Sequence, residues 1–531
     1  MAQTFDFIIV GGGSAGCVLA NRLSADGTTR VLLLEAGGRD RHPLYAMPAG
    51  FAKMTFGLGS WGWHTVPQRH MKNRVLRFTQ ARVIGGGSTV NAQIYTRGNA
   101  LDYDEWRQLG CEGWAYEDVL PYFKKSEDND TYEDRYHAKG GPLGVSKPSA
   151  PLPICEAYFE AAGALGIPTN HDMTGEAQDG VGYYQLTQRN ARRSSTATAF
   201  LHPAEARPNL DVRTGANVHA LVVEKGRVSG VTVRSHDRLD TLYAEADVIL
   251  SAGAIGTPRI LMLSGIGPAD HLAHVGVPVV FDQPEVGGNL QEHLDLFTIS
   301  ECTGDHTYDK YAKPHWSVLA GLQYLFTRKG PVASSLFETG GFWYAEEGAR
   351  SPDIQFHLGL GSGIEAGVAK MANAGVTLNS AYLRPRSRGT VRLPSSDPAA
   401  APLIDPNYWE DPHDRDMAIL GLKLAQEILR QDALKPFVKR EVLPGPAVKT
   451  DAQYFEFACE HAKTDHHPAG TCRMGSDDAA VVDPRLAFRG LEGLRIVDAS
   501  IMPRLVSSNT NAPTIMVAEK AADMIRADHG I

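Results

Sequence analysis

Three glycines and one glutamate near the start of the chain have the types and spacing of a dinucleotide site. Gly11, Gly13 and Gly16 follow a short apolar run and open a helical pattern. Gly11 permits a tight turn, Gly13 lets the backbone approach a pyrophosphate, and Gly16 lets helix and strand pack closely. The helix N-terminus then turns free N–H groups toward the phosphates. Glu35 ends the next apolar run, where it would accept hydrogen bonds from ribose hydroxyls. The alternative is a glycine turn in an α/β domain that binds no cofactor.

Strands and helices in separated parts of the chain must hold this site. Residues 210–251 have the alternating apolar pattern of a β-meander that ends in a buried strand. Residues 494–499 form another apolar run with an acid near its end, and residues 513–526 have the pattern of a closing helix. Residues 353–358 alternate like a half-buried strand, and residues 415–431 have the pattern of an amphipathic helix. We therefore expect an α/β chain whose nucleotide domain is assembled from discontinuous segments.

Composition argues against several classes of function. The 531-residue chain has 61 acidic and 52 basic residues, a net charge of −9 and no basic stripe, so we expect no nucleic-acid partner. Its six cysteines are scattered and form no C-x-x-C pair, which argues against a metal site and a disulfide framework. The first strand begins within a few residues of Met1, and no apolar run reaches about 18 residues. We therefore expect a cytoplasmic protein without a signal peptide or a transmembrane helix.

Five ordered motifs point to one family. They are the glycine turn described above and residues 81–91, 253–267, 467–475 and 497–514. Through these motifs the chain resembles the glucose–methanol–choline (GMC) oxidoreductases, FAD enzymes that oxidise alcohols. The matches run from residue 6 to residue 526, so the resemblance covers the whole chain.

The resemblance implies a fold with two domains. One is a discontinuous Rossmann-like FAD-binding domain of the α/β class, expected from residues 1–150, 200–300 and 475–531. The other is an α+β substrate-binding domain with an antiparallel sheet, expected from residues 151–199 and 301–474.

Two polar side chains match the family's catalytic positions. Alcohol oxidation by a flavin removes a hydroxyl proton and passes a carbon-bound hydride to flavin N5, so a base must lie near the hydroxyl. His467 precedes Pro-Ala-Gly-Thr as the family's histidine does, which makes it the expected general base; the adjacent His466 competes for this role. Asn511 stands where the family has His or Asn, and its amide would hydrogen-bond the substrate oxygen. The alternative is an Asn that only orders the turn, and Asn509 is a neighbour that comes too early for the family position.

The resemblance also implies which residues contact FAD. The adenosine diphosphate half is expected against Gly11, Gly13, Ser14, Ala15 and Glu35, with the adenine near Val218. The pyrophosphate and ribityl chain are expected near Asp498 and Ala499, and the isoalloxazine ring along Gly86, Ser88, Asn91 and Ala92.

Pro513 and Thr514 are expected to open a helix whose positive end stabilises negative charge at flavin N1–C2=O after reduction.

The mode of flavin attachment is predicted from one position. Some family members bind FAD covalently through a histidine of the first signature. Val90 occupies that position here, which predicts non-covalent FAD.

The substrate half gives the finer indication of activity. Residues 309–316 and 330–334 are similar to those of bacterial FAD-linked L-sorbose dehydrogenases, and the whole chain is also similar to dehydrogenases of aliphatic primary alcohols. This resemblance implies oxidation of a primary alcohol to an aldehyde, L-sorbosone in the sorbose case. Electrons would then leave to a quinone or another acceptor. Tyr311 and His357 are candidate contacts to a polyol.

Other readings stay open from the sequence. One is a peroxide-forming oxidase of furanic or aryl alcohols, and another is a quinone-linked dehydrogenase of aliphatic alcohols or choline. A flavoprotein without enzymatic activity is disfavoured because His467 and Asn511 are both present. Residues 316–328 form an amphipathic stretch for which core packing is the favoured interpretation, and peripheral contact with the inner membrane is the alternative. The sequence leaves the oligomeric state open.

Overall fold

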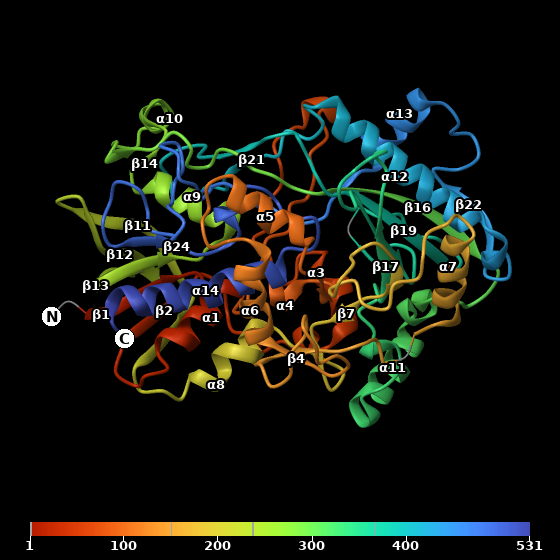
Figure 1. Cartoon of the computed structure of the whole chain (residues 1–531), viewed down its shortest axis with the longest axis horizontal. Coiled ribbons are helices and arrows are strands. Elements are labelled where there is room, and N and C mark those ends of the chain that lie inside the picture. The colour runs from red at the N-terminus through yellow and green to blue at the C-terminus, as the bar shows by residue number, and fades with distance from the viewer. Residues whose placement is uncertain (1–2, 150, 236–237, 366) are drawn as a thin grey trace.

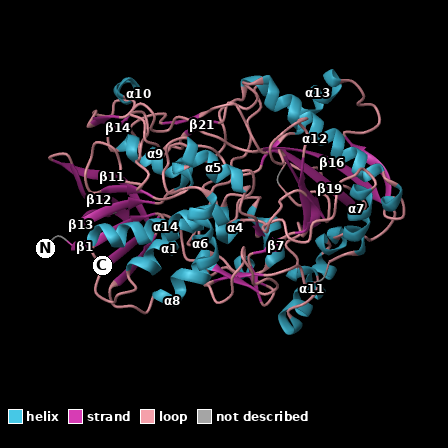
Figure 2. Ribbon diagram, viewed as in Figure 1, coloured by secondary structure: helices cyan, strands magenta, loops and turns pink. Residues whose placement is uncertain are grey.

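Two β-sheets organise the chain in the computed structural model, which describes residues 3–149, 151–235, 238–365 and 367–531 (Figures 1 and 2). Figure 1 shows the first sheet near both chain termini and the second at the opposite end of the molecule. Segments from the start, middle and end of the sequence meet in the first sheet. The expected discontinuous assembly of the nucleotide domain therefore appears in the fold.

The first sheet contains the glycine turn at the end of its first strand. Its strands are β1 (Gln3–Val10), β2 (Val31–Glu35), β10 (Leu210–Thr214), β11 (Ala216–Glu224), β12 (Arg227–Ser235), β13 (Arg238–Leu250) and β24 (Leu494–Ile496). They lie in the order β10-β2-β1-β13-β12-β11, with β24 paired to β13. Strands β10, β2, β1, β13 and β24 are parallel, whereas β11, β12 and β13 form the antiparallel meander. The carboxyl ends of the parallel strands thus share one edge, where ligands bind in open α/β sheets.

Helices from opposite ends of the sequence pack together beside this sheet. Helix α1 (Ser14–Leu23) contacts α14 (Asn511–His529), and Arg22 donates two hydrogen bonds to Glu519 across the contact. Helix α9 (Gly253–Leu263) follows β13 and contacts β11. Since α14 begins at Asn511, the expected start at Pro513 was two residues too late.

The second sheet is antiparallel throughout. Its strands are β6 (Gly180–Tyr183), β16 (Leu294–Cys302), β17 (Thr339–Trp343), β18 (Ile354–Gly359), β19 (Gly375–Tyr382), β22 (Val438–Leu443) and β23 (Lys463–Thr464). The order is β22-β16-β19-β18-β17-β6, with β23 paired to β16. Strand β16 begins at Leu294, so it crosses the expected domain boundary at residue 300.

Helices cover the second sheet on the side seen in Figure 1. Helix α12 (Pro412–Arg430) packs on β16 and β19, and it also contacts α7 (Pro153–Gly163) and α13 (Asp451–His461). Every residue of β18 is buried, so the prediction of a half-buried strand over 353–358 was wrong. The second face of that strand is covered because it lines the interior of the molecule rather than solvent.

The remaining elements connect the two sheets. The other helices are α2 (Pro43–Ala46), α3 (Phe51–Met54), α4 (Gly87–Val90), α5 (Ala100–Gln108), α6 (Tyr116–Ser126), α8 (His202–Ala204), α10 (Ala269–His274) and α11 (Pro314–Thr327). Short strands pair as β3 (Ile94–Tyr95) with β7 (Gln185–Leu186), β4 (Glu127–Asn129) with β5 (Leu143–Val145), and β20 (Thr390–Arg392) with β21 (Leu403–Asp405).

Helix α11 contradicts one expectation from the sequence. Core packing was the favoured interpretation of residues 316–328, yet only Ala320 and Tyr324 of α11 are buried. The helix extends away from the body of the protein at the lower right of Figure 1. No helix among the described residues is both long enough and apolar enough to cross a membrane.

Candidate active site

A cavity of about 300 Å³ lies where the two sheets meet. From the first sheet it is lined by the ends of β1, β2 and β13, including Glu35 and Ser251. From the second it is lined by His357 of β18 and Asn379 of β19, and by Phe337 just before β17. The cavity therefore joins a nucleotide-binding edge to an antiparallel wall that can hold a second ligand.

The glycine turn has no room for side chains. A Cβ atom on Gly16 would lie 1.9 Å from the Gly11 carbonyl oxygen, and one on Gly11 would lie 2.4 Å from the Ser251 carbonyl oxygen. Gly11 also has a φ of +104°, which L side chains rarely adopt. Gly11, Gly13, Ser14 and Ala15 all line the cavity, with the N-terminus of α1 beside it. These residues leave the backbone and dipole free to face a pyrophosphate.

Glu35 holds the glycine turn in place from the end of β2. Its Oε2 accepts a hydrogen bond from the Gly12 N–H at 2.9 Å, and its Oε1 accepts one from the Gly37 N–H at 2.6 Å. Burial raises the pKa of this carboxyl group. Glu35 lines the cavity, so its remaining lone pairs are available to ribose hydroxyls. Val218 of β11 lies on the same cavity wall.

Asp498, which follows β24, holds the start of α9 in place through its carboxylate. Its Oδ2 accepts hydrogen bonds from the Gly253 N–H at 2.9 Å and from Thr257 Oγ1 at 2.6 Å. Its Oδ1 accepts one from the Ser500 N–H at 2.8 Å. Asp498 and Ala499 line the cavity, and the carboxylate fixes the start of α9 against them.

The second glycine cluster meets the first. A Cβ atom on Gly86 would lie 2.6 Å from Gly13 Cα, so this approach requires a glycine at position 86, whereas a Cβ atom on Gly13 would lie 3.9 Å from Gly86 Cα. Gly86, Asn91 and Ala92 line the cavity, as expected for residues along a ring. Ser88 is not among the lining residues, because its hydroxyl donates to the Gly85 carbonyl at 2.5 Å.

Buried Arg193 orients Asn91 and was not found from the sequence. Its Nη1 donates to Asn91 Oδ1 and to the Asn91 carbonyl, each at 2.7 Å. Burial lowers the pKa of Arg193 to about 9. Its sequence neighbours carry no motif that would have indicated this role.

The start of α14 closes one side of the cavity. Asn511 and Thr514 line it, whereas Pro513 does not. Asn511 Oδ1 accepts a hydrogen bond from Ser14 Oγ at 2.9 Å, so it contacts the glycine turn rather than His467. Asn509 is the amide beside His467, with its Nδ2 3.1 Å from His467 Nε2. The structure thus brings Asn509, treated from the sequence as coming too early, next to the expected base.

His467 is held by a short antiparallel pairing. Strand β23 pairs with the start of β16, and the Asp465 N–H donates to the His293 carbonyl at 3.0 Å. The His467 N–H donates to Glu292 Oε1 at 2.6 Å. His466, between these contacts, has a left-handed φ of +62°. Residues 292–293 therefore set the position of the segment that carries His467, although they lie far from it in sequence.

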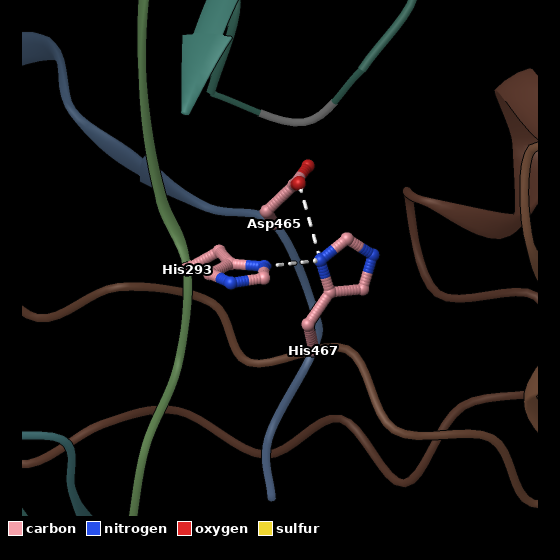
Figure 3. A group of neighbouring side chains, drawn as sticks. All are labelled: His293, Asp465 and His467. Carbon is pink, nitrogen blue, oxygen red and sulfur yellow. Dashed lines mark hydrogen bonds and ion pairs between the residues drawn. The ribbon is translucent and has the colours of Figure 1, made fainter. Parts of the chain in front are cut away.

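Two chains of hydrogen bonds determine which nitrogen of His467 carries the proton (Figure 3). His293 Nε2–H donates to the Leu383 carbonyl at 3.1 Å, which leaves the Nδ1 of a neutral His293 as an acceptor. His467 Nδ1 lies 3.1 Å from that acceptor, so it must be the donor. A neutral imidazole has one N–H, and His467 Nε2 therefore keeps its lone pair.

The opposite side of the ring leads to the same assignment. Asn509 Oδ1 accepts hydrogen bonds from Thr96 Oγ1 at 3.1 Å and from Gln355 Nε2 at 3.0 Å. Its Nδ2–H₂ group is thereby turned toward His467 Nε2, which must accept. The Nε2 lone pair of His467 is thus held by the Asn509 amide, and both residues line the cavity.

The electrostatic surroundings keep both imidazoles neutral. Burial, followed by His357 and Lys463, lowers the pKa of His467 to about 3. Burial and His467 hold the pKa of His293 well below its usual range. Asp465 Oδ2 lies 3.2 Å from His467 Nδ1 without forming a hydrogen bond, and burial raises the pKa of this carboxyl to about 6. The base is therefore deprotonated without needing an ionised partner.

Lys463, Asp295 and Glu365 form a cluster of charged side chains near His467 and Asp465. Lys463 Nζ lies 2.6 Å from Asp295 Oδ2 and 3.3 Å from Glu365 Oε2, and all three side chains are largely buried. Burial opposes the charge of Lys463, but Asp295 and Glu365 raise its pKa. Glu365 and His357 line the cavity, whereas Tyr311 is not a lining residue.

The positions of the side chains around His467 are also relevant to metal binding. Ligand atoms of His293, Asp465 and His467 lie within 4.8 Å of one another, as do those of two other groups of described residues. Neutral imidazoles and a carboxylate are usable cation ligands. The absence of a metal site therefore stays a prediction from the sequence.

Comparison with known proteins identifies the family of this chain. Family models described as "GMC oxidoreductase" match residues 5–295 and 385–518. The chain belongs to the GMC oxidoreductase family and is an FAD-dependent enzyme that oxidises alcohols. The family, the fold class and the FAD cofactor expected from the sequence are therefore confirmed.

Individual relatives match over nearly the full chain. Alcohol dehydrogenase (acceptor) of Pseudomonas putida is 43% identical, covering 98% of this chain and 95% of its own length. Mitochondrial choline dehydrogenase of Homo sapiens is 41% identical, covering 98% of this chain and 90% of its own. Among solved structures, pyridoxine 4-oxidase from Mesorbium loti has a TM-score of 0.90 at 32% identity, covering 99% of both chains.

Proposed function

We propose that the chain oxidises a primary alcohol with further hydroxyl groups, L-sorbose or a related sugar or polyol, to the aldehyde. One observation carries this proposal: of the seven buried polar atoms of cavity-lining residues that have no hydrogen-bond partner among the described residues, four belong to β18, β19 and the segment that carries His467. They are His357 Nε2, Asn379 Oδ1, Asp465 Oδ2 and His466 Nδ1. An unpaired buried polar atom costs about 1–3 kcal/mol. Hydroxyl groups can donate and accept, so a polyol would satisfy these atoms whereas an alkyl chain would not.

In the proposed reaction His467 removes the hydroxyl proton. Its Nε2 lone pair accepts from the amide of Asn509, another cavity-lining residue, and a substrate hydroxyl that takes the place of this amide would donate to it. FAD, when bound, supplies the acceptor for the carbon-bound hydride, which leaves the aldehyde. The amide N–H groups of Asn509 and Asn511 can stabilise the oxyanion that develops as the proton leaves.

The residues around the cavity support the expected placement of FAD. Gly11, Gly13, Ser14 and Ala15, which are glycines or small residues, line the place expected for the pyrophosphate, and a Cβ atom on Gly11 would clash with the Ser251 carbonyl. Val90 lines the cavity and has no nucleophilic atom, which favours non-covalent binding. Acid precipitation should then release the flavin into the supernatant.

The proposed electron acceptor is a quinone or a similar compound. The relative from Pseudomonas putida is named for an acceptor, which supports a dehydrogenase. The competing oxidase would pass electrons to oxygen, and oxygen consumption during turnover separates the two.

Choline is a second candidate for one specific reason. Glu365 and Asp465 place two carboxyl groups on the cavity wall, which favours a cationic alcohol, and several relatives are choline dehydrogenases. Lys463 lies 3.3 Å from Glu365 and neutralises part of this charge, which weakens the case.

A substrate panel tests the proposal. The kcat/KM for L-sorbose should exceed those for choline and for an unbranched alkanol of similar size by at least about tenfold, equivalent to one additional buried hydrogen bond. Asn379→Leu should lower kcat/KM for L-sorbose and leave that for the alkanol unchanged. Preference for choline or the alkanol in the unsubstituted enzyme would overturn the polyol assignment.

A further inference from the structure

Helix α11 presents an apolar face to solvent. Its exposed large side chains are Trp316, Val318, Leu319, Leu322, Leu325 and Phe326, and Phe326 is 80% exposed. A surface helix of a globular protein normally directs such residues toward the core. Figure 1 shows α11 standing out from the second-sheet end of the molecule. The exposed apolar face of α11 therefore indicates a surface that binds a partner.

The apolar stripe lies opposite the stripe that attaches the helix. At about 100° per residue, Val318, Leu322 and Phe326 fall on the side away from Ala320 and Tyr324. Ala320 and Tyr324 are the buried residues of α11, and the Tyr324 hydroxyl donates to the Ala191 carbonyl at 2.9 Å. The attachment orients the apolar stripe outward, so the exposure follows from how the helix is anchored.

Cations flank both ends of this stripe. Lys313 precedes the helix, and Arg328 and Lys329 follow it; all three are exposed. The segment 310–330 contains no Asp or Glu, in a chain whose net charge is −9. These three cations form no ion pair with any described residue, and Arg328 instead lies over the Tyr324 ring. An apolar stripe between cations is complementary to an anionic lipid surface, where the stripe enters the acyl boundary and the cations meet headgroups.

We propose that α11 docks the enzyme on an anionic membrane surface. A second copy of the chain fits the same face less well. A two-fold contact would place the cationic ends of the two helices close together whichever way the helices run. The membrane occupant satisfies the apolar stripe and the cations together.

Docking at α11 would bring the cavity wall near the membrane. The helix contacts the short turns Tyr308–Ala312 and Pro331–Ala333. Tyr308 packs in the same apolar cluster as Leu336 and the cavity-lining Phe337. A quinone dissolved in the bilayer would then be close to the site, a consequence that rests on the proposed acceptor. Vesicle binding itself needs no turnover, so its failure and the failure of the proposed function can be told apart.

Vesicle co-sedimentation of the FAD-loaded enzyme tests the docking. The probes are vesicles of phosphatidylglycerol with phosphatidylcholine, and vesicles of phosphatidylcholine alone. The unsubstituted enzyme should bind the anionic vesicles, and Leu325→Ser/Phe326→Ser should lower the partition coefficient at least about tenfold because two large apolar side chains are lost. Lys313→Gln/Lys329→Gln should weaken binding and reduce its dependence on salt.

A matched control uses exposed side chains elsewhere. Leu239 and Val280 are 62% and 50% exposed and lie by β13 and β15 (Phe281–Asp282) at the end of the molecule opposite α11, so Leu239→Ser/Val280→Ser removes two exposed apolar side chains away from α11. This control should keep vesicle binding within about twofold, and all variants should keep flavin absorbance and dye-coupled activity in solution. Equal loss in both double variants, or no binding by the unsubstituted enzyme, would overturn the proposal. A dimer that Leu325→Ser/Phe326→Ser abolishes, without vesicle binding, would assign the face to a second copy instead.

Discussion

Replacing His293 with Phe should slow the removal of the hydroxyl proton without touching the substrate. His293 accepts from His467 Nδ1–H and donates to the Leu383 carbonyl, and both contacts are 3.1 Å. Phe fills a similar volume but has neither an acceptor nor a donor. The proton of His467 is then free to move to Nε2, which removes the lone pair of that nitrogen.

The size of the effect follows from the lost contact. A hydrogen bond of this kind contributes about 0.5–1.5 kcal/mol, so the rate constant for flavin reduction should fall by about 2- to 13-fold. Asp465 Oδ2, still 3.2 Å from His467 Nδ1, can take over as acceptor and limits the loss. The unpaired Leu383 carbonyl should also cost about 1–3 kcal/mol of folding stability.

Anaerobic stopped-flow absorbance measures this step directly, using L-sorbose or the best alcohol of the panel. His293→Gln is the matched control, because its amide can donate to Leu383 and accept from His467. The Gln variant should keep the rate constant within about twofold, with KM unchanged in both variants. Equal rates for His293→Phe and the unsubstituted enzyme, with FAD bound, would refute the tautomer argument. Equal losses in the Phe and Gln variants would assign His293 a packing role only.

Three further predictions concern pH, cofactor and stability. The pKa of His467 is lowered to about 3, so its imidazole stays deprotonated as pH falls through 6.5, whereas Asp465, with a pKa raised to about 6, gains a proton below that value. A step in the flavin-reduction rate near pH 6 should therefore disappear in Asp465→Asn, and a step at 6.5 that persists there would contradict the assignment. Glu35→Gln should weaken FAD retention about 10- to 100-fold in fluorescence release assays. The Gln amide has only one accepting oxygen, so it cannot replace both carboxylate oxygens that accept from the Gly12 and Gly37 N–H groups. Unchanged FAD retention would remove Glu35 from the site. Glu127→Gln should lower the free energy of unfolding in urea by about 3–5 kcal/mol because it leaves Arg97 buried without its partner at 3.0 Å, while Glu117→Gln at the exposed Arg135 pair leaves the midpoint unchanged. Similar midpoints for the two variants would contradict this account.

Local motifs indicated most of the residues that line the cavity beside the first sheet. The glycine turn, Glu35 and Asp498 are short-range features, and each lies at the end of a parallel strand that its own apolar run indicates. Each is recognised from residues that are neighbours in sequence, although Glu35 and Asp498 form hydrogen bonds with residues further along the chain. The cavity therefore contains most of the expected FAD contacts, with Ser88 and Pro513 as the exceptions.

The residues around the base depend on long-range pairing and were missed. His293 reaches His467 because β16 pairs with β23, and nothing near either histidine in sequence indicates that register. Asn509 was set aside on family position, yet Thr96 and Gln355 turn its amide toward His467. Periodicity identified the α11 stretch but not its exposure, because an apolar stripe has the same spacing whether it faces the core or the surroundings.

The most direct test of the central claim is single-turnover flavin reduction by L-sorbose in the unsubstituted enzyme and in His467→Ala. The account predicts rapid anaerobic bleaching in the first. In the second it predicts a rate constant lower by about 10²- to 10⁴-fold, with FAD still bound and reducible by dithionite. Bleaching of His467→Ala at the normal rate would contradict the assignment of His467 as the base, and no bleaching of the unsubstituted enzyme by L-sorbose would contradict the proposed substrate.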